Sequence, residues 1–432
     1  MPPAQITARQ PRRVVLLLAA VNLVALGSLT APVVAVMPLK FAALLPEDQR
    51  AGALATALAL GSAAALVGNP LFGALSDRTR GRLGRRRPWM LGGVLAGFAF
   101  IAALATADSV AAVIGSWVGA QLAFNATMAA STALLADSVT EQQRGSASGL
   151  FTAAAFVGTL PPLALSALLP RHVDAVSFLM PALALVVMGT AMKIPERMPV
   201  QATPHRPEAR RRAGARLAGS RAFVAVWLQR FAMQAAFSLA AAFTLYLVID
   251  RMTGDPVTAT PVAMIATLCG GTGIVAGAVM GGTWASRRGG YLPFFAAAGI
   301  GLAAAATVRA MAETPVALWL AAAAGGLAVG TSLAVNLALA MRVVPARREG
   351  AYLGLLNVAE TIPQVVVPVA AAALLRVGAG DPISGAADNY AVLYAAAALM
   401  ALVSLLTLPA VRRASAPDAV DAAARPAVST PA

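Results

Sequence analysis

Twelve long apolar stretches, separated by short polar segments, run through this chain of 432 residues. A helix needs roughly 20 mostly apolar residues to cross a bilayer, and in lipid the backbone satisfies its own N–H and C=O groups only as a helix or a closed barrel. We therefore expect an all-α integral membrane protein with twelve transmembrane helices, near 14–39, 51–75, 89–107, 110–136, 148–169, 176–194, 222–249, 260–284, 291–311, 316–341, 350–375 and 389–409.

The first stretch follows two arginines, as the apolar part of a secretory signal peptide does. It is about 25 residues long, however, and it contains Asn22, Pro32 and Pro38. We expect it to be an uncleaved first helix.

The charge of the chain supports a membrane protein and excludes most soluble classes. Only 12% of the residues are charged and 59% are hydrophobic, whereas about a quarter of an average globular domain is charged. The formal net charge is +15, and with the N-terminus inside, 26 of the 33 basic residues lie on one side, as the positive-inside rule requires. We expect both termini in the cytoplasm, the chain in a bacterial inner membrane, and no nucleic-acid binding.

Metal and redox chemistry are not expected. Cys269 is the only cysteine, and His172 and His205 are the only histidines, which leaves no disulfide and no Cys/His zinc site. The sequence also lacks a Gly-x-x-x-x-Gly-Lys-Ser/Thr loop for nucleotide binding. We expect no cofactor.

A polar segment divides the twelve stretches into two sets of six. Residues 195–221 are rich in proline and arginine, so we expect a cytoplasmic linker between an N-terminal bundle at 1–194 and a C-terminal bundle at 222–411, with a disordered tail at 412–432. The halves show weak similarity at an offset of 205 residues, a parallel repeat typical of transporters with a substrate site between the halves. This offset aligns Gly84 with Gly289, Pro88 with Pro293, Gly145 with Gly350, Gly149 with Gly354 and Leu150 with Leu355.

A motif rich in glycine and arginine follows the second stretch. Residues 73–78 read GALSDR and residues 79–89 read TRGRLGRRRPW. The glycine, the Asp-Arg pair and the Gly-Arg-Arg cluster resemble the signature between helices 2 and 3 of the major facilitator superfamily. The form of the motif is most similar to the branch of sucrose transporters and glycoside-pentoside-hexuronide cation symporters. The resemblance covers the whole chain and implies two pseudo-symmetric six-helix bundles, the major facilitator fold.

The resemblance also implies a gate. Asp77 would meet the start of the eleventh span, where a helix N-terminus offers unpaired N–H groups and a positive dipole end, and Asp137 would receive an arginine from the Asp77 loop. This network would close the cytoplasmic side when the site faces out. A solvated basic loop is the alternative, which we favour for Arg80 and Arg82. The implied gating residues are Gly73, Asp77, Arg78, Gly84, Arg85, Asp137, Arg144 and Gly350.

The assignment to the sugar branch rests on two short motifs, of which the second lies in the eleventh span. Gly354, Asn357 and Gln364 resemble helix 11 of sucrose transporters. The chain departs from the family in the second copy of the loop motif at 281–289, which has no acidic residue. The first span also lacks the aromatic and polar residues expected of a sugar symporter.

Two ionisable residues, Arg230 and Glu360, stand out inside the predicted spans. Such a residue costs about 2.5–3.5 kcal/mol at a helix centre on insertion scales. Both lie at similar depth in one bundle, roughly 12 and 15 Å from the cytoplasmic end at 1.5 Å per residue. We expect them to pair, and protonation or cation capture at Glu360 to free Arg230 for the substrate. A purely structural ion pair is the alternative.

Polar residues on the first, fourth, seventh and tenth spans form the predicted substrate site, because these spans line the central cavity in the superfamily. Each amide is also a candidate for a simple hydrogen bond between helices. The substrate-site candidates are Asn22, Thr30, Gln121, Asn125, Arg230, Gln234, Ser332 and Asn336, with Glu360 and Arg230 as the coupling pair.

The sequence therefore predicts a secondary active transporter, not an enzyme. It would move a small organic solute, such as a sugar or glycoside, by alternating access coupled to a proton or monovalent cation gradient, as a monomer in the bilayer. A proton-driven drug or metabolite exporter of the same fold is the main alternative. A membrane-embedded enzyme and a sensor that no longer transports are further alternatives.

Overall fold

The computed structural model describes residues 10–169, 172–194, 196, 209–241, 243–344, 349–378 and 380–415. All regular elements in these ranges are helical. The first half contains α1 (Gln10–Ser28), η1 (Pro32–Val36), α2 (Met37–Leu44), α3 (Glu47–Arg78), α4 (Arg87–Thr106), α5 (Val110–Ser138), η2 (Glu141–Gln143), α6 (Arg144–Leu168) and α7 (Val173–Ala191). The second half contains α8 (Ala209–Ala241), α9 (Thr244–Val248), η4 (Ile249–Thr253), α10 (Pro256–Arg288), α11 (Leu292–Ala310), α12 (Pro315–Val343), α13 (Glu349–Leu375), α14 (Tyr390–Val403), η5 (Ser404–Thr407) and α15 (Leu408–Ser415).

Ten helices in the described ranges are long and apolar enough to cross a membrane. They cover all the predicted spans except 14–39, which is divided among α1, η1 and α2, and 350–375, which coincides with α13. The prediction of an all-α chain is thus confirmed within the described ranges, and ten of the twelve predicted spans correspond to helices that are long and apolar enough to cross a membrane.

The predicted linker and tail lie largely outside the described residues. Of 195–221, the structure describes residue 196 and the stretch from Ala209, where α8 already begins, ahead of the predicted span. Of the tail, it describes only the end of α15 at Ser415. A membrane span and its helix need not share a boundary, because a helix can extend into water beyond the lipid.

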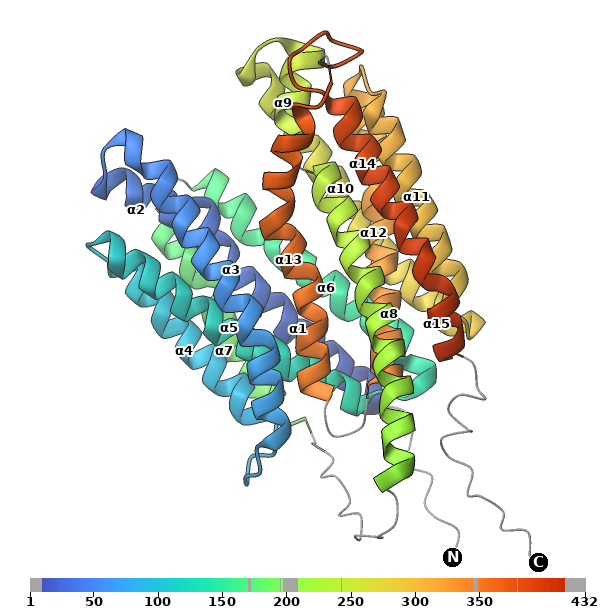
Figure 1. The fold of residues 1–432 in the computed structure, drawn as a ribbon. Helices are drawn as coiled ribbons and strands as arrows, with labels where there is room; N and C mark the ends of the chain where they lie inside the picture. Colours follow the sequence, from blue (N-terminus) through green and yellow to red (C-terminus); the bar gives the residue numbers. More distant parts are fainter. Residues whose placement is uncertain are drawn as a thin grey trace, which may run out of the picture.

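The first helical rod of each half is interrupted, where the sequence suggested continuous helices. In the first half, Pro32 opens the π-helical segment η1, since proline has no N–H to donate to the preceding turn. In the second half, α8 ends at Ala241 and Phe243 adopts a left-handed conformation with φ of 60°, a region that bulky residues rarely occupy. Both interruptions lie toward the same end of the molecule, near α2 and α9 in Figure 1.

The two halves pack against each other at one end and separate toward the other (Figure 1). One apolar core cluster joins both halves and includes Leu18, Phe151, Val226 and Leu339. Nearer α2 and α9, the core divides into one cluster in the first half and another in the second. We call the joined end, where α1 begins and α3 ends, the closed end, and the other the open end.

Glycines allow the close approach of the helices at the closed end. A Cβ on Gly73 would overlap the backbone of Gly350, and one on Gly354 would overlap Asn69 and lie 2.6 Å from the Cα of Pro70. The related pair, α6 and α10, makes the same kind of contact, since a Cβ on Gly145 would lie 2.6 Å from the carbonyl oxygen of Gly282. Small residues at such positions let membrane helices touch backbone to backbone.

The 205-residue offset corresponds to real structural equivalence. Gly84 and Gly289 both adopt positive φ, at 90° and 65°, before the helices α4 and α11. Gly145 and Gly350 both lie in the first turn of a helix that packs across the interface between the halves.

We predict that Gly354→Leu will weaken the closed end. The new side chain would overlap Asn69 and Pro70, and overpacking of this kind typically costs about 1–3 kcal/mol. The melting temperature in detergent should fall, and cysteines placed on α3 and α13 should cross-link less efficiently.

Gly271→Leu on α10 is the matched control, because a Cβ there meets no atom within 4 Å. Equal effects of the two substitutions would contradict a specific role for the α3–α13 contact.

Candidate functional site: a central cavity and a closed end

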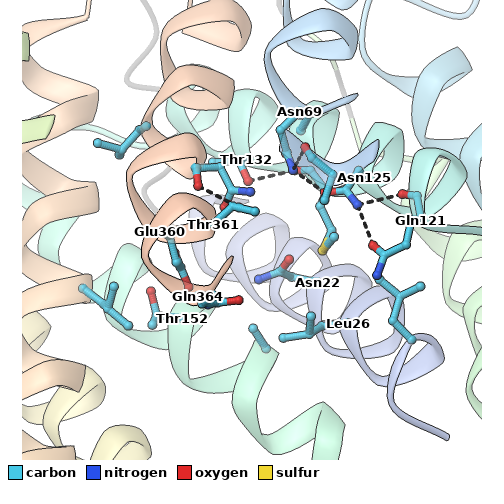
Figure 2. Close-up of a pocket in the computed structure, with 18 of the residues that line it drawn as sticks. Asn22, Leu26, Asn69, Gln121, Asn125, Thr132, Thr152, Glu360, Thr361 and Gln364 are labelled. Atoms are coloured by element: carbon cyan, nitrogen blue, oxygen red, sulfur yellow. Dashed lines mark hydrogen bonds between the residues drawn. The ribbon is translucent and has the colours of Figure 1, made fainter. Parts of the chain in front are cut away.

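A cavity of about 470 Å³ lies between the two halves. Residues of α1, α3, α5 and α6 form one wall, and residues of α8, α12 and α13 form the other. Figure 2 shows the polar side chains of both walls directed into the space between these helices. Of the predicted substrate-site residues, five line the cavity: Asn22, Thr30, Gln121, Asn125 and Arg230.

The wall from the first half carries a cluster of amides. Asn125 donates to the carbonyl oxygen and to the side-chain Oε1 of Gln121, at 2.7 and 3.1 Å, and accepts a hydrogen bond from Asn69. Asn22 donates to the carbonyl oxygen of Phe151 at 3.2 Å. These bonds fix the amides while leaving Asn22 Oδ1 and Gln121 Nε2 without a partner among the described residues. The wall thus offers both an acceptor and donors to a polar ligand.

The wall from the second half carries an ion pair. Arg230 Nη2 lies 2.5 Å from Glu360 Oε2, and the two side chains are 12% and 21% exposed. Arg230 Nη1 also lies 3.5 Å from Asn336 Oδ1. Among the described lining residues, these two are the only charged ones. The cavity is therefore neutral overall while the pair is intact, and either partner alone would give it a net charge.

Three predicted substrate-site residues, Gln234, Ser332 and Asn336, do not line the cavity. Ser332 and Asn336 are buried between α12 and α8, where Gln229 bridges them. Gln229 donates to Ser332 Oγ at 3.0 Å and accepts from Asn336 Nδ2 at 2.7 Å. Asn336 thus contacts Arg230 from the side away from the cavity, and Gln229 fixes its position.

Gln229 and Asn69 were absent from the predicted site. The sequence signal for Gln229 was the spacing of Ser332 and Asn336, one helical turn apart on an otherwise apolar helix. Two buried polar groups on one face need a polar partner on the facing helix. Asn69 is held against Asn125 in the same way, across α3 and α5.

Asp77 links the two halves at the closed end. Its carboxylate accepts hydrogen bonds from the backbone N–H groups of Gly350 at 3.2 Å and Ala351 at 3.0 Å, in the first turn of α13. Arg86, which is fully buried, lies 2.6 Å from Asp77 Oδ1 and donates to Ser76 Oγ at 2.6 Å. A carboxylate at a helix N-terminus is favoured by the helix dipole and by the unpaired N–H groups.

A second carboxylate, Asp137, joins the same network. Arg85 Nη2 lies 2.8 Å from Asp137, and Arg86 Nε lies 3.4 Å from it. Both guanidinium groups also approach Glu349 of α13, at 3.8 and 3.7 Å. Burial by itself lowers the pKa of Arg85, but Asp137 and Glu349 outweigh it, so its pKa lies above the ordinary value. Arg85 therefore stays charged, and together with Arg86 it holds carboxylates from both halves.

The remaining gating candidates are Arg78, Arg144 and Gly84. Arg78 is exposed, and Arg144 is the partly buried first residue of α6. Gly84 approaches Glu196, a residue that the sequence did not point to. The Glu196 carboxylate accepts hydrogen bonds from the backbone N–H groups of Arg85, Arg86 and Arg87 at 2.6, 3.0 and 2.8 Å. It thereby caps the start of α4, and a side chain at Gly84 would overlap it.

Comparisons with known proteins bear on both the fold and the family. The model of the Major Facilitator Superfamily matches residues 16–308. No curated protein sequence matches the chain. Among solved structures, the human organic anion transporter MFSD10 (TETRAN) is similar with a TM-score of 0.69 and 19% identity, over 94% of this chain and 100% of that one.

Two further solved structures have the same fold. The proton:xylose symporter XylE gives a TM-score of 0.72 at 14% identity, over 92% of this chain and 94% of that one. A bacterial homologue of the iron transporter ferroportin, in an outward-facing state, gives 0.66 at 16% identity, over 93% of this chain and 100% of that one. At these identities the likeness concerns the fold alone. The family model covers well over half of the chain, and the chain therefore belongs to the major facilitator superfamily of membrane transporters.

Proposed function

We propose that this chain is a secondary active transporter that moves a small organic solute by alternating access, coupled to a proton or monovalent cation gradient. The observation that carries the proposal is the ion pair of Arg230 and Glu360 in the wall of the central cavity. Membership in a transporter family favours this over a membrane-embedded enzyme. The chain would act as a monomer in a bacterial inner membrane, with both termini in the cytoplasm, so the closed end would be the cytoplasmic one.

The coupling mechanism follows from the charge of the cavity. Glu360 is the only carboxylate among the described lining residues, and it neutralises Arg230 while it is ionised. Protonation of Glu360, or its capture by a cation, releases the guanidinium, which then binds the solute. A charge left unpaired in the membrane is costly, so the empty cavity returns to the paired state. Solute and proton therefore cross together.

A neutral polar solute such as a sugar or glycoside fits the wall from the first half. Its amides offer donors and acceptors in the directions that hydroxyl groups need, and the cavity of about 470 Å³ is within the usual range for small-molecule sites. The similarity of the loop motif to glycoside symporters supports the same substrate class.

A metabolite or drug exporter is the second candidate. It is favoured by the apolar residues that also line the cavity, among them Leu26, Val33, Met128 and Leu333, and an anionic metabolite would suit Arg230. Counterflow in proteoliposomes with pooled glycosides, pooled organic anions and lipophilic cations separates these classes. Exchange of glycosides alone is expected, and exchange of lipophilic cations alone would contradict the proposal.

We predict that Glu360→Gln will uncouple transport. The amide cannot take up a proton, so the solute gains no driving force from the pH gradient. One pH unit corresponds to about 1.4 kcal/mol per proton, or about tenfold accumulation at one proton per solute, and this accumulation should vanish while counterflow remains.

Glu313→Gln is the matched control, because Glu313 is an exposed carboxylate between α11 and α12. Full accumulation by the Glu360→Gln variant would contradict the role of Glu360 and leave the ion pair with a structural role only.

We predict that Asp77→Asn will shift the protein away from its closed-end conformation. The substitution removes the charge that binds the α13 N-terminus and leaves the buried Arg86 without this partner, and breaking such a pair typically costs about 3–5 kcal/mol. Spin labels at Leu83 and Arg412, both exposed at the closed end, should report longer distances in a background in which Cys269 is replaced by serine.

Asp108→Asn, which removes an exposed carboxylate at the other end of α4, should leave the distances unchanged. Unaltered distances in the Asp77→Asn variant would show that the closed end does not depend on this carboxylate.

A further inference from the structure

A second cavity, of about 510 Å³, lies on the outer face of the first half among α3, α4 and α5. Its walls are apolar and include Phe72, Trp89, Phe100 and Leu122. The polar atoms at its margin bond to each other, since Trp89 Nε1 donates to Thr79 Oγ1 at 2.7 Å and Thr79 donates to Leu75 O at 2.9 Å. We call this cavity the groove. Its described lining offers a ligand an apolar surface, because the polar side-chain atoms at its margin are already hydrogen-bonded.

The groove faces outward, and two glycines, which have no side chain, help to form it. Gly92 and Phe100 of its lining are exposed, as is the neighbouring Leu95, and in a membrane protein such an apolar outer face lies against lipid. A Cβ on Gly92 would meet no atom within 4 Å, whereas one on Gly119 would lie in the ring of Phe100. Gly119 therefore lets Phe100 form part of the floor, and Gly92 leaves the groove empty.

The length of the groove matches one leaflet of a bilayer. Its lining on α4 runs from Pro88 to Phe100, which corresponds to about 18 Å at 1.5 Å per residue. Half of a hydrocarbon core of about 30 Å is about 15 Å. A lipid chain that entered beside Pro88 would fill the groove to its far end near the middle of the membrane.

The mouth of the groove is strongly basic. Arg78 at the end of α3, and Arg80 and Arg82 on the loop that follows, are exposed, and within the described residues no salt bridge involves them. The neighbouring acidic residue, Asp77 of α3, is turned toward Arg86 and α13 instead. Clusters of arginine beside a membrane span attract anionic lipid headgroups.

We propose that this groove binds an anionic phospholipid, with one acyl chain between α3, α4 and α5 and the phosphate on Arg78, Arg80 and Arg82. The lipid comes from the leaflet on the side of this loop. The site is separate from the central cavity and does not depend on the proposed function. Its acyl chain packs on Phe72 and Trp89, whose ring centroids lie 5.6 Å apart, and so supports the end of α3 that carries Asp77.

The acyl-chain part of the proposal is tested by Gly92→Leu. The Cβ of the new side chain meets no protein atom within 4 Å, and the leucine extends into the space of the groove, so we expect the fold to be retained and the lipid to be displaced. Gly189→Leu on α7 is the matched control, since Gly189 is also exposed with no atom within 4 Å of a Cβ. Native mass spectrometry of the full chain, titrated with phosphatidylglycerol and with phosphatidylcholine of the same acyl chains, measures the binding.

We expect the wild type and Gly189→Leu to bind one phosphatidylglycerol more tightly than any phosphatidylcholine, and Gly92→Leu to lose this tight site. Equal phosphatidylglycerol affinity in the wild type and Gly92→Leu would overturn the proposal. Equal affinity of the wild type for the two lipids would also overturn it, because the bound lipid would then be annular and unselected.

The headgroup part is tested by the double variant Arg80→Gln/Arg82→Gln. An arginine near an anionic headgroup changes affinity by about fivefold, so phosphatidylglycerol binding should weaken about 25-fold while phosphatidylcholine binding stays the same. Arg287→Gln/Arg288→Gln, which removes two exposed arginines at the end of α10, is the control. An equal loss in both double variants would reduce the effect to general surface charge and overturn the assignment of the phosphate.

Discussion

The carboxylate of Asp77 at the N-terminus of α13 is the contact on which the closed end depends. It joins the halves directly through two backbone N–H groups, and it neutralises Arg86, whose guanidinium has no access to solvent. A buried guanidinium is tolerable only with such a partner. The contact in turn requires Gly73 and Gly350, because any side chain at either position would separate α3 from α13. The ionic contact of Asp77 and the close packing of α3 on α13 therefore depend on each other.

The symmetry-related contact between α6 and α10 has a weaker hydrogen bond than the contact between α3 and α13, because its acceptor is uncharged. Ser146, 205 residues before Ala351, donates its backbone N–H to the hydroxyl of Ser286 at 2.9 Å. A neutral hydroxyl thus takes the place that the Asp77 carboxylate has in the other pair, and hydrogen bonds to charged groups are roughly twice as strong as neutral ones. The two halves share a backbone plan, but most of the electrostatic energy of the closed end is on the α3–α13 side.

The sequence predicted the helices well and the inward faces less well. Hydropathy alone indicates where a helix crosses the membrane, and the family motif indicates which loops meet, as the contacts of Asp77 illustrate. The rotation of a helix is harder to predict when most of its faces are apolar, so Ser332 and Asn336 were expected in the cavity although they bind Gln229 behind it. In the arginine-rich segment before α4, the sequence did not distinguish Arg85 from its neighbour Arg86, of which only the latter is fully buried. Glu196 was not foreseen because it contacts α4 from a segment distant in sequence.

The helix α13 connects the closed end to the central cavity. Its first turn holds Asp77 through Gly350 and Ala351, and Glu360 lies ten residues after Gly350 on the same helix, about 15 Å along its axis. Pro363 follows Glu360, so no proline interrupts the connecting segment, and a helix without such a break tilts as one body. Arg230, by contrast, is on α8, in the same half as Glu360. A tilt of α13 relative to α8 that withdraws Gly350 from Asp77 would therefore also move Glu360 relative to Arg230. Such a tilt would link the ion pair to the closed end through one helix, without a chain of side-chain contacts between them.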